Sequence, residues 1–384
     1  MIPQDEVVPR AAWDSAPWNR RTFQRVRELI PTAAVRRGAG PIMHLPSALT
    51  DLTGLKVACD GVTQTLEECL QSSYTDGFLI LHRNRIVMER YVNGMTPSTL
   101  HLSQSVAKSL LGTLAGILAG QGCLDLEAPV TSYLPALERT AYRGATVQHV
   151  LDMTSGVAWD ENYEATDSDI ARMNVASGWK DSPDATWPRC MWELVLTLQR
   201  AERAHGELFA YRSIETDVLG FVLQQAGGAS LAELLSRELW QPLGAEEDAC
   251  ITVDPAGFPS GCGGFNATLR DYARFASLYL NDGRAAGKQL LPPAWIEDVQ
   301  AANHALFVGH YRDVLPRGAY HNQFWIEDPE RPALMARGIY GQLIYIDPAA
   351  GFAGVKLSSW PAFVDVAGTR RAVAAMRAIR TALG

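Results

Sequence analysis

Runs of apolar and β-branched residues near both ends of the chain are typical of strands. Residues 76–92 contain two such runs separated by the polar turn Arg83-Asn84-Arg85, and this pattern predicts a β-hairpin. Three more strands are expected near the other end, at 323–326, 341–346 and 352–358, the last two joined by a turn over 347–351. Antiparallel sheet is therefore predicted from both ends of the chain.

Between these ends, apolar residues recur at three- and four-residue spacing, which predicts helices. The expected helices are 105–119, 147–153, 191–199, 214–226, 231–239 and 269–281, with a last one over 364–383. The predicted fold class is α/β of the α+β type, an antiparallel sheet flanked by helices with an inserted helical domain.

This alternation of patterns predicts a division of the chain into domains. The expected parts are an N-terminal arm over 1–50, an α/β domain over 51–100 and 265–384, and the inserted helical domain over 101–264. The polar segment 159–188 interrupts the helical part, and a loop of that length is expected to cover a cleft between the two domains.

Composition narrows the classes of function. The 384 residues are 47% apolar and 20% charged, with a formal net charge of -8, which excludes a disordered chain and argues against binding to nucleic acid or to an anionic membrane. The first six residues include Asp5 and Glu6 where a secretory signal would be basic. A cytoplasmic protein is therefore expected. The six cysteines have no zinc-site spacing.

Lysine is scarce, and one of the five lysines lies in an almost wholly apolar helix. Lys108 follows Ser105 by three residues, so the two side chains face the same side of that helix. Burial without a negative partner disfavours an ammonium ion, and a helix amino terminus favours negative charge on the serine. The pair has the properties of an activated nucleophile and its base.

A plainer interpretation is that Ser105 only caps the helix and that Lys108 extends its stem to the surface. Ser-x-x-Lys is a short pattern, and the chain contains a second copy at 177–180, in the polar segment. The second copy has no apolar helix behind it, and we interpret it as accidental.

Two further segments could complete a site. Tyr211 stands just before a helix that Ser213 is expected to cap, where a phenol beside a lysine could relay a proton. Glycines at 338 and 341 flank the start of a strand, where the backbone can approach a ligand closely and donate hydrogen bonds to an oxyanion.

Taken in order, Ser105-Val106-Ala107-Lys108, Tyr211-Arg212-Ser213 and Gly338-Ile339-Tyr340-Gly341 resemble the motifs of the serine β-lactamase and penicillin-binding protein superfamily. More narrowly, the chain is similar to the class C-like branch of esterases and amide hydrolases, which includes the 6-aminohexanoate-dimer hydrolases. The segments 150–157 and 263–271 carry the same resemblance, which extends over about residues 75–380 and implies a β-lactamase/transpeptidase-like fold.

The resemblance implies a role for each matching residue. Ser105 would be the acylated nucleophile, Lys108 its general base and Tyr211 the group that passes the proton to the leaving amine or alcohol. The backbone N–H groups of Ser105 and Gln342 would form the oxyanion hole. Substrate contacts are expected from residues around this centre, namely Tyr163, Trp159, Ser213, Tyr340 and Gly341.

Two departures from the superfamily pattern bear on the substrate. Ser213 stands where the Tyr-x-Asn element has its asparagine, and Ile339 and Tyr340 replace the Lys-Thr or His-Thr pair, so no cation occupies the first position. Poor hydrolysis of penicillins and cephalosporins is therefore expected. A neutral, partly aromatic pocket is expected instead, with candidate linings Trp159, Tyr163, Trp179, Trp187 and Tyr340.

The leading hypothesis is a serine hydrolase that forms an acyl-enzyme and cleaves linear amides or carboxylic esters of small molecules, with a homodimer left open. This hypothesis includes neither a metal nor an organic cofactor. Two alternatives remain at this stage. One is a non-catalytic penicillin-recognising sensor or binding protein, and the other is a D-amino-acid peptidase.

Overall fold

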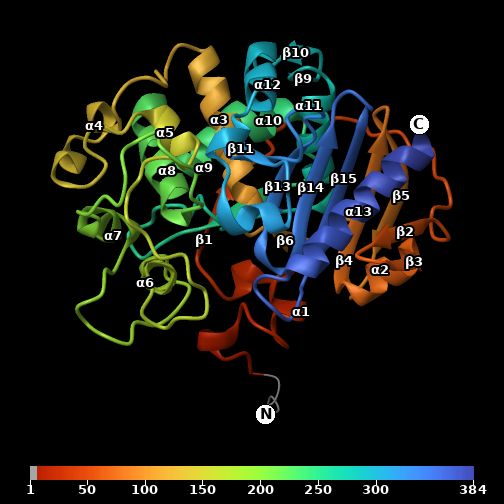
Figure 1. Ribbon diagram of the computed structural model, residues 1–384, viewed down its shortest axis with the longest axis horizontal. Helices are drawn as coiled ribbons and strands as arrows, with labels where there is room; N and C mark the ends of the chain where they lie inside the picture. The colour runs from red at the N-terminus through yellow and green to blue at the C-terminus, as the bar shows by residue number, and fades with distance from the viewer. Residues whose placement is uncertain (1–6) are drawn as a thin grey trace.

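A seven-stranded antiparallel sheet forms the centre of the computed structural model, which describes residues 7–384 (Figure 1). Its strands in spatial order are β11 (Ala319–His321), β12 (Phe324–Ile326), β13 (Leu334–Gly338), β14 (Gln342–Asp347), β15 (Phe352–Ser358), β4 (Thr75–His82) and β5 (Arg85–Tyr91). Strands from the two ends of the chain meet where β15 pairs with β4. The acidic segment Met1–Glu6, on which the expectation of no export signal depends, lies outside the described residues.

The predicted hairpin is present as β4 and β5. Its two turn residues, Arg83 and Asn84, both have positive φ angles, 48° and 59°, as a two-residue turn between right-twisted strands requires. Every residue of β4 except His82 is buried, because β4 lies inside the sheet with both faces covered.

Helices cover both faces of this sheet. Successive side chains of β4 point to opposite faces, so alternate residues pack against different helices. Leu79 and Leu81 pack in one hydrophobic cluster with α3 (Val106–Gly120) and α11 (Leu269–Leu280). Phe78 and Ile80 pack in another with α13 (Val366–Leu383), the predicted C-terminal helix. Short α2 (Leu66–Ser72) lies beside α13 (Figure 1).

The remaining helices gather mainly at one end of the sheet (Figure 1). They are α4 (Val130–Tyr133), α5 (Val147–Leu151), α6 (Asp169–Ala176), α7 (Met191–Thr197), α8 (Ser213–Gly227), α9 (Leu231–Leu234, continued by a π-helix over Leu235–Trp240) and α10 (Gln241–Leu243), with α1 (Asn19–Thr22) in the arm and α12 (Pro293–Gln300) near the sheet. Within residues 7–384, no single helix is long and apolar enough to cross a bilayer. Only α8 and the helical segment 231–243 together pass that test, as a pair bent by 73°.

The sequence predicted that 159–188 is one long loop, and this prediction is wrong. The segment contains the two-turn helix α6, whose first turn is capped by Ser168 through a hydrogen bond from the Ala171 N–H. The buried side chains of Ile170 and Met173 anchor this helix in the main core. Their three-residue spacing was the helical signal within an otherwise polar segment.

A second sheet, which the sequence did not predict, ties the N-terminal arm to the middle of the chain. Its order is β1 (Thr32–Val35), β7 (Ala249–Thr252), β8 (Phe265–Ala267) and β6 (His101–Leu102). Two small ribbons complete the strands, β2 (Lys56–Cys59) with β3 (Val62–Thr65) and β9 (Arg284–Ala285) with β10 (Lys288–Gln289).

The arm is more deeply embedded than a surface segment. Trp13 and Phe23 are almost fully buried in a cluster that includes Tyr340 and Trp360. The indole N–H of Trp13 donates to the backbone carbonyl of Trp179 at 2.9 Å. The arm therefore supports the end of β13 and the loop after β15, where the candidate site lies.

Candidate active site

Ser105 stands at the junction between a strand and a buried helix. Strand β6 ends at Leu102, and the backbone then turns through Gln104, whose φ of 49° is unusual for a residue other than glycine. Ser105 is the N-cap residue of α3 and only 9% exposed. All residues of α3 from Val106 to Leu118 are buried, which confirms the expectation of a helix enclosed on every side.

The predicted meeting of Ser105 and Lys108 is confirmed. The Lys108 ammonium is 3.0 Å from the Ser105 hydroxyl, and it also donates to the Cys262 carbonyl at 2.7 Å and to the Ser213 hydroxyl at 3.2 Å. Lys108 is only 2% exposed. The alternative in which Lys108 extends to the surface is therefore wrong, and three acceptors hold its amine against the serine.

The premise that Lys108 has no negative partner is wrong. Burial lowers the pKa of Lys108, but the negative potential of Tyr211, Cys262 and Glu161 outweighs it, so the pKa lies above its ordinary value. Burial also raises the pKa of Tyr211 and, together with Asp217, that of Cys262. The resting site therefore holds an ammonium ion.

Glu161 is the functional residue that the sequence reasoning missed. Its carboxylate accepts hydrogen bonds from the Ser213 N–H at 2.9 Å, the Ser213 hydroxyl at 2.5 Å and the Tyr163 hydroxyl at 2.7 Å. The Trp159 indole N–H donates to it as well. Glu161 therefore fixes the segment 159–163 against the start of α8 and faces Lys108. The only sequence signal for Glu161 was the polar composition of the segment 159–188, which was expected to cover a cleft.

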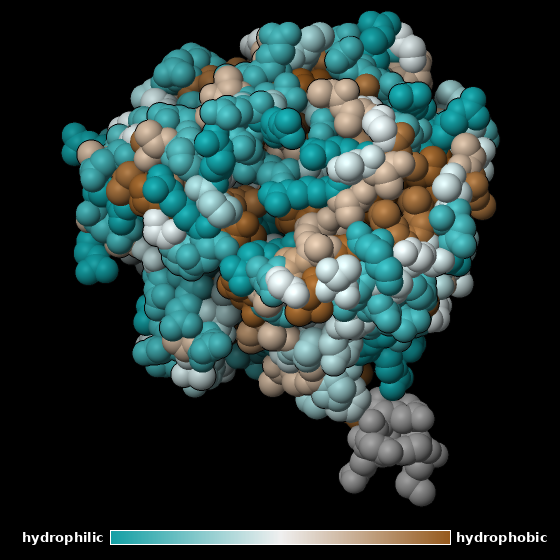
Figure 2. Space-filling view, turned by 45° about the vertical axis from the view of Figure 1, so that its right-hand side comes forward, coloured by the Kyte–Doolittle hydropathy of each residue, from teal (hydrophilic) through white to brown (hydrophobic). Residues whose placement is uncertain are grey.

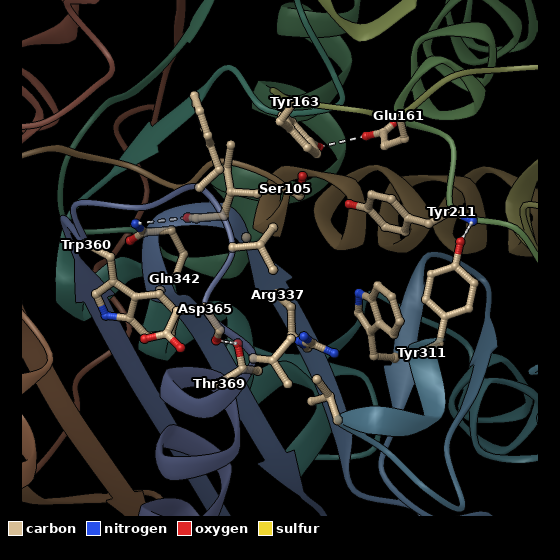
Figure 3. A pocket seen from close by; sticks show the side chains of 18 of the residues that line it. Ser105, Glu161, Tyr163, Tyr211, Tyr311, Arg337, Gln342, Trp360, Asp365 and Thr369 are labelled. Carbon is tan, nitrogen blue, oxygen red and sulfur yellow. Dashed lines mark hydrogen bonds between the residues drawn. The ribbon is translucent and has the colours of Figure 1, made fainter. Parts of the chain in front are cut away.

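Tyr211 lines the cleft, with its ring near Ser105 (Figure 3). The Lys108 amine is 5.1 Å from the centre of the Tyr211 ring. Burial raises the pKa of Tyr211, while the charge of Lys108 and hydrogen bonds with Ser105 and Lys108 pull it down, leaving it above its ordinary value. The phenol is therefore protonated beside the serine, and the Tyr311 hydroxyl accepts from the Tyr211 N–H at 2.8 Å.

The end of β13 passes directly over Ser105. A Cβ atom on Gly338 would lie 3.0 Å from the Ser105 nitrogen and 2.7 Å from the Ser103 carbonyl oxygen, so only glycine fits there. Within residues 7–384, the backbone N–H groups of Ser105 and of Ile339, the next residue after Gly338, have no acceptor. The expected donor Gln342 lies across the ladder from Gly338, and its side chain is held by the Ser358 backbone.

The cleft above Ser105 is a pocket of about 420 Å³ between β13, β14 and the start of α13, visible as a hollow with apolar walls in Figure 2. Its lining includes Ser105, Tyr163, Tyr211, Trp325, Arg337 and Gly341. A smaller pocket of about 40 Å³ lies on the other side of Ser105, with Gln104, Ser213, Cys262 and Trp179 in its lining. Ile339 borders both pockets.

The aromatic residues expected to line the pocket are divided between several places. Tyr163 and Trp179 line the two pockets. Tyr340 is 1% exposed and packs against Phe23, so its side chain does not reach either pocket. Trp159 and Trp187 also lie outside both linings; Trp159 bonds Glu161, and Trp187 lies under Arg172.

The expectation of a neutral pocket is wrong. Arg337 lines the larger pocket with Glu161 and Asp365, and the Arg337 side chain points into the cleft (Figure 3). Arg337 precedes Gly338 in β13, just outside the four-residue motif that carries the family resemblance.

The structure brings together Ser105, Lys108 and Tyr211, with the Lys108 amine against the serine hydroxyl and the tyrosine ring. Residues 62–377 match the β-lactamase family. The chain belongs to this family and is a hydrolase of the β-lactamase superfamily.

Proteins similar to the chain include two curated relatives and a solved structure. A 6-aminohexanoate-dimer hydrolase of Paenarthrobacter ureafaciens is 36% identical over 357 residues, which are 91% of this chain and 88% of the relative. Esterase EstB of Burkholderia gladioli is 30% identical over 43% of this chain and 42% of its own length. A Bacillus anthracis structure, provisionally named a 6-aminohexanoate-dimer hydrolase, superposes with a TM-score of 0.90 at 29% identity and covers 100% of this chain and 99% of its own.

Proposed function

We propose that this protein hydrolyses linear amides and carboxylic esters through an acyl-enzyme on Ser105. The observation that carries the proposal is the 3.0 Å contact between the Ser105 hydroxyl and a buried Lys108 amine at the floor of a 420 Å³ pocket. A hydroxyl held against a potential proton acceptor at a helix amino terminus meets the requirements for nucleophilic catalysis.

In acylation, Ser105 attacks the substrate carbonyl carbon and its proton passes to Lys108 in the neutral form. The tetrahedral oxyanion accepts hydrogen bonds from backbone N–H groups. We assign these to Ser105 and Ile339, in place of the Gln342 expected from the resemblance, because Ile339 follows Gly338 directly and its N–H is free in the described part of the chain.

Tyr211 gives its proton to the leaving amine or alcohol as the carbon–heteroatom bond breaks, and Lys108 returns a proton to Tyr211. Water then attacks the ester on Ser105 by the reverse sequence of proton transfers and releases the acid. The names of the relatives support linear amides such as 6-aminohexanoate oligomers, along with esters, as the substrate class.

The test is the turnover of a 4-nitrophenyl ester and of 6-aminohexanoate dimer by the Ser105→Ala variant. Turnover should fall by at least about a thousandfold, because the members of such a site act as a unit. Ser132→Ala, an exposed serine on α4, is the matched control and should keep full activity.

The thermal midpoint of Ser105→Ala should stay close to that of the wild type, since the hydroxyl makes no contact that the fold depends on. Activity retained in Ser105→Ala would remove this residue from the mechanism.

A further inference from the structure

Arg337 places a positive charge in the pocket with no anion beside it. Its guanidinium carbon lies 4.6 Å from the centre of the Trp325 ring. In the described part of the chain, Arg337 forms no ion pair, and its side chain donates no hydrogen bond. Burial lowers the pKa of Arg337 to about 10, so the group stays charged at neutral pH.

Arg337 is half-buried. A guanidinium partly removed from water without a partner loses solvation, and an anion with matching geometry offsets that cost. The acidic residues of the same pocket are already engaged. Glu161 accepts from Ser213 and from the Tyr163 hydroxyl. Asp365 caps α13 through the Gly368 N–H at 2.8 Å, and Asp160 accepts from the Asn162 N–H at 3.0 Å. The anion that would satisfy Arg337 must therefore come from the ligand.

The position of Arg337 identifies the part of the substrate that it would meet. Trp325 stacks on Tyr211, with ring centres 5.3 Å apart, and also underlies Arg337. Tyr211 protonates the leaving group in the proposed mechanism, so the leaving group lies on the Trp325 side of Ser105. Neither Tyr211 nor Arg337 borders the smaller pocket.

We propose that Arg337 binds a carboxylate on the leaving part of the substrate, and that it selects amides and esters whose leaving amine or alcohol ends in a carboxylate. The inference rests on the proposed function. A guanidinium presents a planar pair of N–H groups that matches both carboxylate oxygens, and the indole of Trp325 holds that plane in place. Arg337 is thus a specificity-determining residue, and it takes no part in proton transfer.

The test compares two esters that differ at a single end group. Both 6-acetoxyhexanoate and 6-acetoxyhexanamide carry the same acetyl group and the same chain, and acetate release measures turnover of each. The wild type should prefer the carboxylate by about ten- to a hundredfold in kcat/KM, the range expected for a hydrogen-bonded charge pair.

In Arg337→Gln this preference should disappear through a higher KM for the carboxylate, while kcat/KM for the carboxamide and for 4-nitrophenyl acetate stays within about twofold. Arg337→Lys should restore part of the preference, since it keeps the charge without the fork. Arg337→Glu should reverse it in favour of 6-acetoxyhexylammonium.

Equal losses on both esters in Arg337→Gln would overturn the inference and make Arg337 a mere support for Trp325. Equal kcat/KM values of the wild type for the two esters would overturn it as well. Both results leave the proposed function intact. Failure of the proposed function has a different signature, namely no acetate release from either ester by the wild type, or full release by Ser105→Ala.

Discussion

At the scale of single residues, the protonation of Lys108 governs the proposed mechanism. The buried amine touches the Ser105 hydroxyl, and the nearby Glu161 carboxylate helps to hold the pKa of Lys108 above its ordinary value. A protonated amine cannot accept the serine proton. The reactive form is therefore the minor one at neutral pH, and Glu161 combines two opposed effects, ordering the site and restraining its base.

This conflict predicts the pH dependence of catalysis. Because the proton must leave the Lys108–Tyr211 pair before Ser105 reacts, kcat/KM for a 4-nitrophenyl ester should rise through the alkaline range, with an apparent pKa that belongs to the pair. Glu161→Gln removes a negative charge, which lowers the pKa of Lys108. The rising limb of the profile should therefore move to lower pH.

The matched control is Glu164→Gln, an exposed carboxylate in the same segment, which should leave the profile in place. A limb that stays fixed in Glu161→Gln, or moves to higher pH, would contradict the role given to Glu161.

At the scale of elements, the first five residues of α8 include two buried carboxylates. Glu215 and Asp217 are both fully buried. Burial raises the pKa of Glu215 to about 7, against the opposing effects of Arg212 and Ser155, and raises that of Asp217 to about 6. One Glu215 oxygen accepts from Ser155, and the other has no partner within residues 7–384. Glu215 and Asp217 therefore keep their protons to a higher pH in the folded protein than in the unfolded chain.

Glu215 should make the stability of the protein fall as the pH rises. Its pKa is raised in the folded state, so the folded protein binds more protons than the unfolded chain between the ordinary pKa of 4.5 and about 7. The stability that this group contributes is fully present below that range and is lost as the pH rises through about 7. The loss should amount to a few kcal/mol.

Urea unfolding of the wild type and of Glu215→Gln at a series of pH values measures this effect. The variant should be less sensitive to pH over that range, and the exposed control Glu233→Gln should follow the wild type. A wild type and Glu215→Gln with parallel curves would refute the assignment.

The elements that could be predicted are those in which one physical pattern dominates. Buried α3 and the hairpin β4–β5 each have an unbroken apolar run with clear turn or cap residues. Strand β13 escaped prediction because its five residues, Leu334–Gly338, include no β-branched side chain, and its partners stabilise it from both sides. The four-stranded sheet escaped because its strands are two to four residues long and far apart in the chain.

At the scale of the whole molecule, the site is built from segments that lie far apart in the chain and meet only in the folded protein. Local sequence patterns do not show such contacts. Ser105, Lys108 and Tyr211 could be predicted, since their motifs are continuous and ordered along the chain. Glu161 and Arg337 could not be predicted, because the contacts that place them in the site form only on folding. Glu161 contacts the start of α8, and Arg337 contacts Trp325. The N-terminal arm packs against Tyr340 and Trp360, beside the site.

Trp13 tests the contribution of the arm. It is almost fully buried beside Trp179 and in the cluster that holds Tyr340 and Trp360, so Trp13→Ala should lower the free energy of unfolding by about 3–5 kcal/mol. Leu49→Ala, at a side chain that is 70% exposed, should change it by less than about 0.5 kcal/mol. Similar small changes in both variants, measured by chemical denaturation, would mean that the arm is only laid on the surface.

The acyl-enzyme on Ser105 is the central claim, and rapid-quench mass spectrometry tests it most directly. The protein is mixed with 4-nitrophenyl acetate, quenched in acid at successive times and digested, and the acetylated peptide is mapped. The account predicts an acetyl group on Ser105 that forms and decays within the turnover time and is absent in Ser105→Ala. Turnover without an adduct on Ser105, or an adduct that maps to another residue and keeps pace with turnover, would contradict it.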